Sequence, residues 1–298
     1  MSPDPRNQRL FITAKRDTPL DDLLRTNLAD PESAENLVAC GAVWLDRNRI
    51  MDPEFPVRRG CTVRVFLRPG QTEPFVLEPD AVVFRDSRVL VVAKPAGVPV
   101  QADPTSLFHN LARGVADYLR KDGEIFAPTP VSRLDVPVSG LVLFAVSKKW
   151  ERELFRLMRE RRIHKMYCAV LSGDGPGRIL VDAPLGWRDG RAACDPAGKP
   201  SRTLFLRRGD WQGLPRYTVI PFTGRRHQIR AHAAGRLSPV AGDTRYGALR
   251  RPDIRGIALA CAGYNFTLAQ TRYRIRLSSD RLVSMLEPFA SSLLEGDQ

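Results

Sequence analysis

The chain has 298 residues, of which 43% are hydrophobic, so it is not a disordered chain and can form one large domain or a large and a small one. Its net charge of +13 and its pI of about 10.1 predict attraction to a polyanion, with nucleic acid the first candidate and an anionic membrane the second. Only seven of the 46 basic residues are Lys, and the planar fork of Arg suits phosphate and RNA, although an Arg-rich proteome would give the same composition.

The first 70 residues predict a small domain of helices followed by strands. A helix is expected over 18–25. Thr18 can cap it, Pro19 suits its first turn, and the leucines that follow share one face. The remaining expected elements are a helix over 32–39 and strands over 42–45 and 62–67. The segment Arg68-Pro-Gly-Gln-Thr-Glu-Pro74 is interrupted by Pro and Gly, so residues 71–80 are expected to be a linker.

This N-terminal order of two helices, a strand, a turn and a strand resembles the alpha-L RNA-binding domain. The matching segments are Leu20-Asp-Asp-Leu-Leu24, Gly41-Ala-Val-Trp-Leu45 and Val57-Arg-Arg-Gly-Cys-Thr-Val-Arg-Val65. The resemblance implies a module that binds RNA. Its helices carry few positive charges, so a small packing domain is the alternative.

Residues 81–298 predict a second, larger domain in which strands outnumber helices. Strands are expected over 82–84, 89–93, 141–146, 167–171, 203–206, 216–220 and 273–277, and helices over 107–120, 147–162 and 282–294, with a mixed segment over 254–266. Because the strands do not alternate regularly with helices, we expect an α+β fold with a mainly antiparallel or mixed sheet.

One aspartate, Asp135, stands between an arginine and a Ser-Gly turn in Val131-Ser-Arg-Leu-Asp-Val-Pro-Val-Ser-Gly-Leu141, just before a segment expected to be a buried strand. A carboxylate at such a junction is anchored by rigid structure and can face a cleft. The pattern Arg-Leu-Asp-x-x-x-Ser-Gly-Leu closely resembles the catalytic motif of the RluA-like pseudouridine synthases, which isomerise uridine in RNA. An isolated Arg-x-Asp is usually a surface ion pair, but the full motif favours catalysis.

The resemblance implies that Asp135 is the catalytic carboxylate. Forming pseudouridine requires breaking the N1–C1′ bond, turning the uracil and rejoining it through C5. A carboxylate can serve at the ribose as nucleophile or as base, so a nucleophilic and a glycal-type mechanism both stay open. The reaction needs no redox step, so we expect neither a cofactor nor a metal.

Two more segments carry the resemblance. Tyr167 follows Arg162-Ile-His-Lys-Met, similar to the family's Lys-x-Tyr strand start, and a phenol there can stack on a flipped uracil and move a proton. The segment Thr223-Gly-Arg-Arg-His-Gln-Ile-Arg-Ala-His232 resembles the family's Gly-Arg-x-His-Gln-Ile-Arg-x-His. Within it, Arg230 matches the arginine that pairs with the catalytic aspartate and keeps it ionised.

The resemblance also implies residues that bind the substrate. Arg133 matches the arginine that fills the space left by the extruded base. The other expected RNA contacts are Lys94, Arg225, Arg226, His227 and Gln228. His227 and His232 are expected to be hydrogen-bonded rather than metal ligands.

Further segments match in the family's order, so the resemblance covers most of residues 82–277. Val91-Val-Ala-Lys-Pro-Ala-Gly-Val-Pro-Val100, Gly242-Asp-Thr-Arg-Tyr-Gly247 and Leu259-Ala-Cys-Ala-Gly-Tyr-Asn-Phe266 are expected to form scaffold around the cleft. The chain departs from the family at Ser132, usually His, at Val138, often Thr, and at Arg226, commonly Thr. These departures can alter the choice of RNA.

The sequence therefore predicts a cytoplasmic, monomeric RNA pseudouridine synthase acting on ribosomal or transfer RNA. Five scattered cysteines without a Cys-x-x-Cys pair predict reduced thiols and no zinc site. The N-terminus lacks a signal-peptide pattern, and no apolar run reaches the roughly 18 residues that span a bilayer. The alternatives are a non-catalytic RNA-binding or ribosome-assembly protein, a retaining glycosidase and a basic membrane-surface protein.

Overall fold

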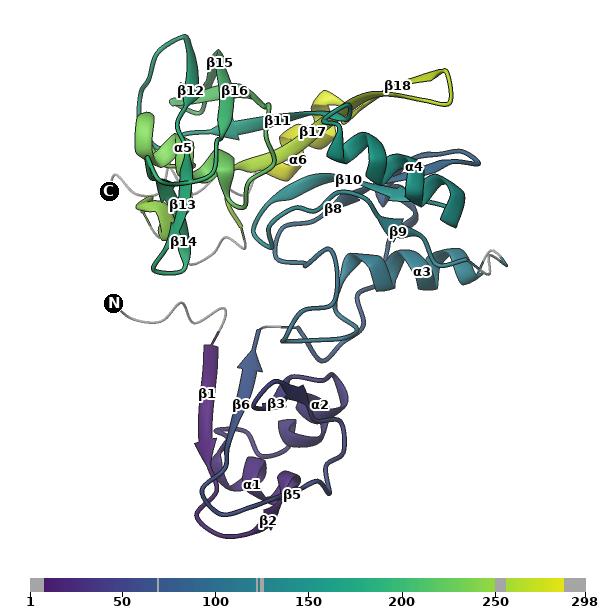
Figure 1. Ribbon diagram of the computed structural model, residues 1–298, viewed down its shortest axis with the longest axis vertical. Helices are drawn as coiled ribbons and strands as arrows, with labels where there is room; N and C mark the ends of the chain where they lie inside the picture. The colour runs from purple at the N-terminus through teal and green to yellow at the C-terminus, as the bar shows by residue number, and fades with distance from the viewer. Residues whose placement is uncertain (1–7, 69, 122, 124–125, 250–255, 287–298) are drawn as a thin grey trace. The chain divides into compact units, whose positions relative to one another are not determined.

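The computed structural model describes residues 8–68, 70–121, 123, 126–249 and 256–286 (Figure 1). The chain divides into two compact units. The first unit comprises residues 1–77 and 101–127, and the second comprises residues 78–100 and 128–298. The predicted boundaries at residues 70 and 80 stay a prediction, and each unit is described by itself.

The first unit combines a four-stranded sheet in the order β1-β6-β3-β4 with short helices. Its strands are β1 (Gln8–Thr13), β2 (Thr18–Pro19), β3 (Val43–Leu45), β4 (Asn48–Arg49), β5 (Pro56–Val57) and β6 (Thr62–Leu67), and its helices are α1 (Leu20–Asn27), α2 (Ser33–Ala39) and α3 (Leu111–Lys121). Leu20 and Leu24 of α1 and Val63 and Val65 of β6 are fully buried in one apolar core. Alternating side chains along β6 and the leucine face of α1 therefore meet as their periods predict.

Thr18 does not cap the first helix. It pairs with Val57 in the short β2–β5 ladder, and Pro19 takes the N-cap position of α1 with no side-chain hydrogen bond. The predicted start was wrong by two residues, because a long-range pairing competes with the local cap. The expected helix over 107–120 also begins later, at Leu111, since the amide of Leu107 bonds to the carbonyl of Cys40 instead.

The second unit is built on a ten-stranded sheet. The main path runs β12-β15-β16-β11-β17-β10-β8-β7, with β18 beside β17 and β9 beside β10. These strands are β7 (Val82–Arg85), β8 (Val89–Lys94), β9 (Thr129–Pro130), β10 (Ser139–Ala145), β11 (His164–Val170), β12 (Arg178–Asp182), β15 (Arg202–Trp211), β16 (Leu214–Pro221), β17 (Leu259–Leu268) and β18 (Thr271–Arg276). Only the β10–β17 pair is parallel among the described pairs, which confirms the predicted mainly antiparallel α+β fold.

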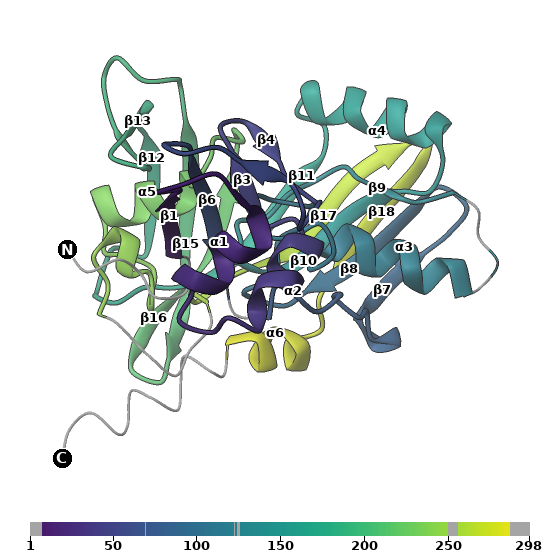
Figure 2. The same cartoon turned by 90° about the horizontal axis from the view of Figure 1, so that it is seen from below.

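Helices cover both faces of this sheet. Figure 2 shows α4 (Lys148–Arg159) and α6 (Ser279–Leu286) on opposite sides of it. Ser147 caps α4, where its hydroxyl accepts from the amide of Trp150, and Leu154 and Leu157 are the residues that the helix buries. The helix α5 (Gln228–Arg236) packs on a hairpin of β13 (Leu185–Arg188) and β14 (Arg191–Cys194). Smaller 3₁₀ turns cover Pro79–Ala81 and Thr244–Tyr246.

The glycine of the Ser-Gly-Leu motif sits where the two parallel strands meet. Gly140 has a φ of +106°, and a Cβ added there would lie 2.4 Å from the backbone nitrogen and oxygen of Cys261. No other residue type fits this position without moving β17. The motif thus fixes β10 against β17, and the loop before β10 inherits that position.

The sequence missed β12 and the β13–β14 hairpin, and most of the expected strands extend further than their apolar runs. The expected last helix reaches residue 286 in the described range, and residues 287–294 of that prediction lie outside it. All five cysteines are free. No helix in the described ranges is long and apolar enough to cross a membrane.

Candidate active site

Asp135 lies in the loop between β9 and β10, and its side chain is 27% exposed. Backbone hydrogen bonds hold this loop on three sides. The carbonyl of Asp135 accepts from Val138, that of Val136 from Gly97, and that of Pro137 from Ile257. Because Gly97 and Ile257 come from separate segments, the backbone that carries the Asp135 carboxylate is fixed in place.

Arg230 of α5 holds the Asp135 carboxylate from the buried side. Its Nη1 donates to Asp135 Oδ2 at 3.1 Å, while its Nε and Nη2 donate to the two oxygens of Asp243 at 2.6 and 2.8 Å. Its guanidinium also lies 4.9 Å from the centre of the Tyr246 ring. Burial acts to lower the pKa of Arg230, but the hydrogen bonds and charges of Asp243 and Asp135 raise it overall, so the cation is permanent.

His227 forms the second contact to the same carboxylate oxygen. Its Nε2 lies 3.6 Å from Asp135 Oδ2, and its Nδ1 lies 3.0 Å from the hydroxyl of Tyr246. Burial lowers the pKa of His227 to about 4, and the charges of Arg230, Arg245 and Arg226 act in the same direction against that of Asp135. The imidazole is therefore neutral at pH 7, and its contact with Asp135 is not an ion pair.

These contacts leave one side of the carboxylate available. Asp135 Oδ1 makes no hydrogen bond with any residue that the structure describes, while Oδ2 faces Arg230 and His227. A carboxylate that is held through one oxygen and partly exposed can act on a group that approaches the other oxygen. This geometry suits attack on a ribose carbon or removal of a ribose proton.

Tyr167 of β11 stands opposite Cys261 of β17, next to a β-bulge. It is only 8% exposed. Burial raises the pKa of Tyr167 well above its usual value, and the nearby thiol of Cys261 and the charge of Asp135 raise it further. The hydroxyl is therefore protonated at neutral pH and close enough to Asp135 to sense its charge.

The predicted RNA-binding arginines differ in their surroundings. Arg133 is exposed and makes no hydrogen bond or ion pair within the described part of the chain. Arg226 is exposed and places its guanidinium 4.1 Å from the ring centre of Trp187. Arg225 is half-buried, and its Nε donates to the carbonyl of Pro200 at 3.1 Å. Arg133 and Arg226 are thus free to contact a ligand, and Arg225 is partly committed to the fold.

Two predicted RNA contacts are buried and need correction. Lys94 has no exposed surface, and its ammonium donates to the carbonyls of Pro95, Val98 and Val136. Gln228 is 4% exposed and bonds to Arg202, Thr203, Thr223 and Arg225. Neither the Lys94 ammonium nor the Gln228 amide can reach RNA without breaking these hydrogen bonds. Lys94 instead holds the loop that carries Asp135, and Gln228 holds the start of α5.

The departure at Ser132 has a structural partner. Ser132 is buried, and its hydroxyl lies 2.6 Å from that of Tyr264 and accepts from the amide of Leu143 at 3.0 Å. The Tyr264 hydroxyl also donates to the carbonyl of Leu141. Ser132 therefore ties the segment before Asp135 to β10 and β17 and does not face a ligand.

Sequence reasoning missed the site roles of Asp243, Tyr246 and Trp187. The Gly-Asp-x-x-Tyr-Gly segment was expected to be scaffold only, and no local pattern pairs Asp243 with Arg230, which lies 13 residues earlier. Asp243 is 1% exposed, and Tyr246 links His227 to the amide of Ala192 in β14. The Asp-Gly pair at 189–190, a strong hairpin signal, pointed to the strands that carry Trp187.

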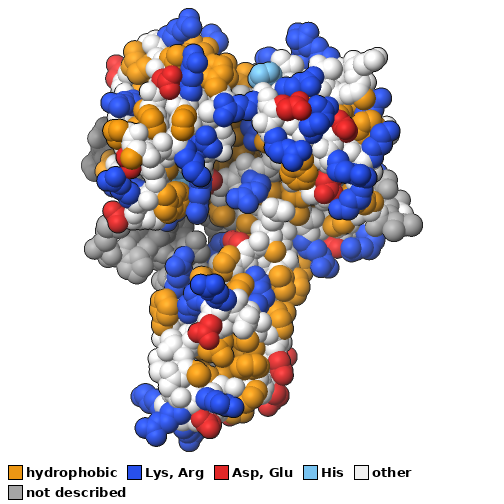
Figure 3. All heavy atoms as spheres, viewed as in Figure 1, with side chains coloured by type: hydrophobic (Ala, Val, Ile, Leu, Met, Phe, Trp, Pro, Cys, Tyr) orange, Lys and Arg blue, Asp and Glu red, His pale blue; other side chains and the backbone are white. Residues whose placement is uncertain are grey.

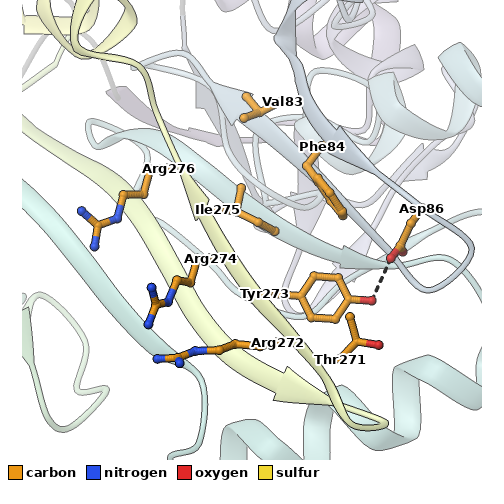
Figure 4. A pocket seen from close by; sticks show the side chains of 9 residues that line it. All are labelled: Val83, Phe84, Asp86, Thr271, Arg272, Tyr273, Arg274, Ile275 and Arg276. Atoms are coloured by element: carbon orange, nitrogen blue, oxygen red, sulfur yellow. Dashed lines mark hydrogen bonds between the residues drawn. The ribbon is translucent and has the colours of Figure 1, made fainter.

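A separate hollow of about 660 Å³ lies between β7 and β18 (Figure 4). Its lining comprises Val83, Phe84, Asp86, Thr271, Arg272, Tyr273, Arg274, Ile275 and Arg276. Figure 4 shows Tyr273 and Ile275 on one side of β18 and the three arginines on the other. None of the predicted catalytic residues lines this hollow, so it is not the site of the chemistry.

Comparisons with known proteins identify the family of the chain. Residues 88–235 match the family model for RNA pseudouridylate synthase. The ribosomal large subunit pseudouridine synthase C of Escherichia coli (strain K12) is 31% identical over 249 residues, which cover 76% of each chain. The dual-specificity RNA pseudouridine synthase RluA of Salmonella typhi is 33% identical over 178 residues, which cover 56% of this chain and 77% of that protein.

Two solved structures share the fold. Human RNA Pseudouridylate Synthase Domain Containing 1 matches with a TM-score of 0.58 and 23% identity, covering 70% of this chain and 86% of that one. Human RNA Pseudouridylate Synthase Domain Containing 4 matches with a TM-score of 0.56 and 19% identity, covering 70% and 93%. The family model and the sequence relatives, not the solved structures, show that the chain belongs to the RluA-like family of RNA pseudouridine synthases.

Proposed function

We propose that this isomerase converts specific uridines to pseudouridine in ribosomal or transfer RNA, with Asp135 as its catalytic carboxylate. The observation that carries the proposal is the clamp on Asp135 Oδ2 by Arg230 and His227, which leaves the other oxygen open. Large-subunit ribosomal RNA is the first substrate to test, because the match to the enzyme named for it extends over 76% of the chain. The protein would work in the cytoplasm, as a monomer.

In the proposed reaction, Asp135 acts at the ribose while the N1–C1′ bond breaks. The uracil turns, C5 bonds to C1′, and the hydrogen on C5 leaves as a proton while N1 gains one. Arg230 holds Oδ2 of Asp135 through a contact of 3.1 Å and so aims the other oxygen at the ribose. We expect Tyr167, a buried phenol that stays protonated at neutral pH, to stack on the base and to exchange a proton at C5.

A uridine in a stacked helix cannot present C1′ and C5 to one cleft, so the nucleotide must leave the stack. Arg133 is three residues from Val136 in the same loop, exposed and without a partner in the described ranges, which suits a side chain that fills the vacated space. We expect Arg133→Ala to lower turnover on folded RNA more than on an unstructured strand. Equal losses on both would count against this role.

Positive charge beyond the site supports RNA as the partner. Figure 3 shows Lys and Arg side chains spread over the face of the second unit that carries α4. Arg272, Arg274 and Arg276 point to one side of β18, are exposed, and form no hydrogen bond or ion pair with other described residues. Guanidinium groups without an acidic partner on the protein are available to phosphate.

The test is tritium release from 5-tritiated uridine in unmodified ribosomal and transfer RNA transcripts. Isomerisation must expel the hydrogen on C5, so release by the native protein with one RNA class establishes both reaction and substrate. Tight RNA binding without release from any transcript or assembled ribosomal particle would instead support a non-catalytic RNA-binding protein. Mapping the modified position then identifies the uridine.

A further inference from the structure

The β13–β14 hairpin is fixed to the active site by its own strand. Asp189 and Gly190 both have positive φ, of 48° and 74°, which is the geometry of a tight two-residue hairpin turn. The amide of Ala192 donates to the hydroxyl of Tyr246, the same hydroxyl that lies 3.0 Å from His227. The Tyr246 hydroxyl therefore holds the hairpin next to His227, which contacts Asp135.

Trp187 on this hairpin is an exposed aromatic residue beside the catalytic carboxylate. It stands opposite Ala192 and is 45% exposed. Its ring centre lies 5.4 Å from that of His227, whose Nε2 lies 3.6 Å from Asp135 Oδ2. One histidine ring thus separates the indole from the carboxylate.

Arg226 lies over one face of the Trp187 indole, so the outer side of its guanidinium continues the stack. Its guanidinium lies 4.1 Å from the centre of the indole ring, and the side chain is exposed. The indole N–H makes no hydrogen bond within the described part of the chain. A large aromatic side chain that keeps nearly half its surface in water gains little from burial, so packing alone does not account for it.

We propose that Trp187 and Arg226 form a stacking site for the nucleobase adjacent to the target uridine. The inference rests on the proposed function, because it needs a uridine bound at Asp135. When that uridine reaches Asp135, the adjacent nucleotide lies next to it, where the guanidinium stacked on the indole offers a planar, cationic surface. Stacking on such a surface accepts any base, and the cation adds attraction to the phosphate.

If the indole and the neighbouring base stack, removing either of them should raise KM by the same factor. The substrate is the RNA transcript that the native enzyme modifies, shortened to its modified stem-loop, with an abasic nucleotide at the 5′ or 3′ neighbour of the target. With native protein, the abasic site on the recognised side should raise KM roughly 10-fold, a typical loss of one aromatic stack, and change kcat less than about 2-fold. The abasic site on the other side should have a smaller effect.

Protein variants complete the cycle. Trp187→Ala should raise KM for the intact stem-loop by the same factor, and the abasic site should then cause no further rise in KM. Trp187→Phe should keep most of the difference in KM between the intact and the abasic stem-loop. Trp211→Ala is the matched control, since Trp211 also precedes a two-residue hairpin turn but contacts none of the site residues. Circular dichroism melting of each variant checks that the fold is intact.

Independent losses would overturn the proposal. If Trp187→Ala and the abasic sites multiply their effects on KM, or if Trp187→Ala binds RNA like the native protein, the indole does not stack on the neighbour. If native protein makes no pseudouridine in any RNA, the proposed function fails instead.

Discussion

Arg230 and Arg226 are four residues apart in the same segment, but their surroundings are opposite. Arg230 is 4% exposed, makes hydrogen bonds to two aspartates and lies over the Tyr246 ring. Arg226 is exposed and lies over the aromatic ring of Trp187. The first is committed to the protein, and the second is available to a ligand.

The buried and the exposed arginine therefore contribute to different properties of the enzyme. A buried ion pair is insensitive to salt but costly to break, since a partner left alone remains a buried charge. An exposed arginine contributes to affinity through phosphate, and its contribution falls as salt rises. Changes on the buried side should therefore alter stability and kcat, and changes on the exposed side should alter KM and the salt dependence.

The largest effect is expected from Arg230→Gln. Asp243 is 1% exposed and would be left without its cation, so the free energy of unfolding should fall by about 3–5 kcal/mol. Turnover should fall at least about 100-fold, because Asp135 loses its clamp. Urea unfolding and tritium release measure the two losses.

The control for this change is Arg226→Gln, which should leave the unfolding free energy within about 0.5 kcal/mol of the native value. If both variants were equally stable, the buried and exposed arginines would not differ as described. Adding Asp243→Asn to Arg230→Gln should recover part of the stability, since it removes the unpaired buried charge.

The next effect concerns His227 and pH. Its folded pKa of about 4 lies below the ordinary value of 6.5, so unfolding takes up a proton between these values and stability is lost as pH falls through that window. The loss should reach about 2–3 kcal/mol between pH 7 and pH 4.5. His227→Asn accepts the positive φ and does not titrate, so its urea unfolding curves should lack this component. Parallel pH curves for the two proteins would contradict a neutral, buried imidazole.

A smaller effect is expected at the Ser132–Tyr264 pair, which belongs to the buried side. Tyr264→Phe removes the donor to Leu141 and the partner of Ser132, so the unfolding free energy should fall by about 1–2 kcal/mol. In the double variant with Ser132→Ala the two losses should not add, because they remove one shared hydrogen bond. Additive losses in thermal and urea unfolding would separate the two hydroxyls.

The smallest effect on catalysis should come from the exposed side. Replacing Arg272, Arg274 and Arg276 together by Gln should leave kcat within about 2-fold of native. If each arginine contacts one phosphate of a single strand, the slope of log affinity against log salt should fall by roughly 2. Filter binding at a series of salt concentrations measures the slope. An unchanged slope would show that RNA does not bind these three arginines.

Local signals predicted the fold class and the elements with clear periodicity. The alternation along β6 and the caps and apolar face of α4 depend on neighbouring residues only, and both appear within a few residues of their predicted ends. The start of α1 was misplaced because Thr18 pairs with a strand distant in sequence. Local patterns carry no information on such pairings.

The site shows the same division. Motif positions indicated Asp135, Tyr167 and Arg230, and the structure brings Asp135 and Arg230 into hydrogen-bond contact. Lys94 and Gln228 were interpreted as RNA contacts because both are polar and lie in motif segments. Their burial depends on tertiary packing, which the motif does not reveal, and their hydrogen bonds are satisfied inside the protein.

The most direct test of the account is single-turnover tritium release by native protein and by Asp135→Asn, with RNA affinity measured in parallel. Asparagine keeps the size of the side chain but can neither attack nor accept a proton as a carboxylate does. The account predicts that release falls at least about 1,000-fold while RNA affinity stays within a few-fold, because the exposed arginines are unchanged. Release at a native-like rate by Asp135→Asn would contradict it.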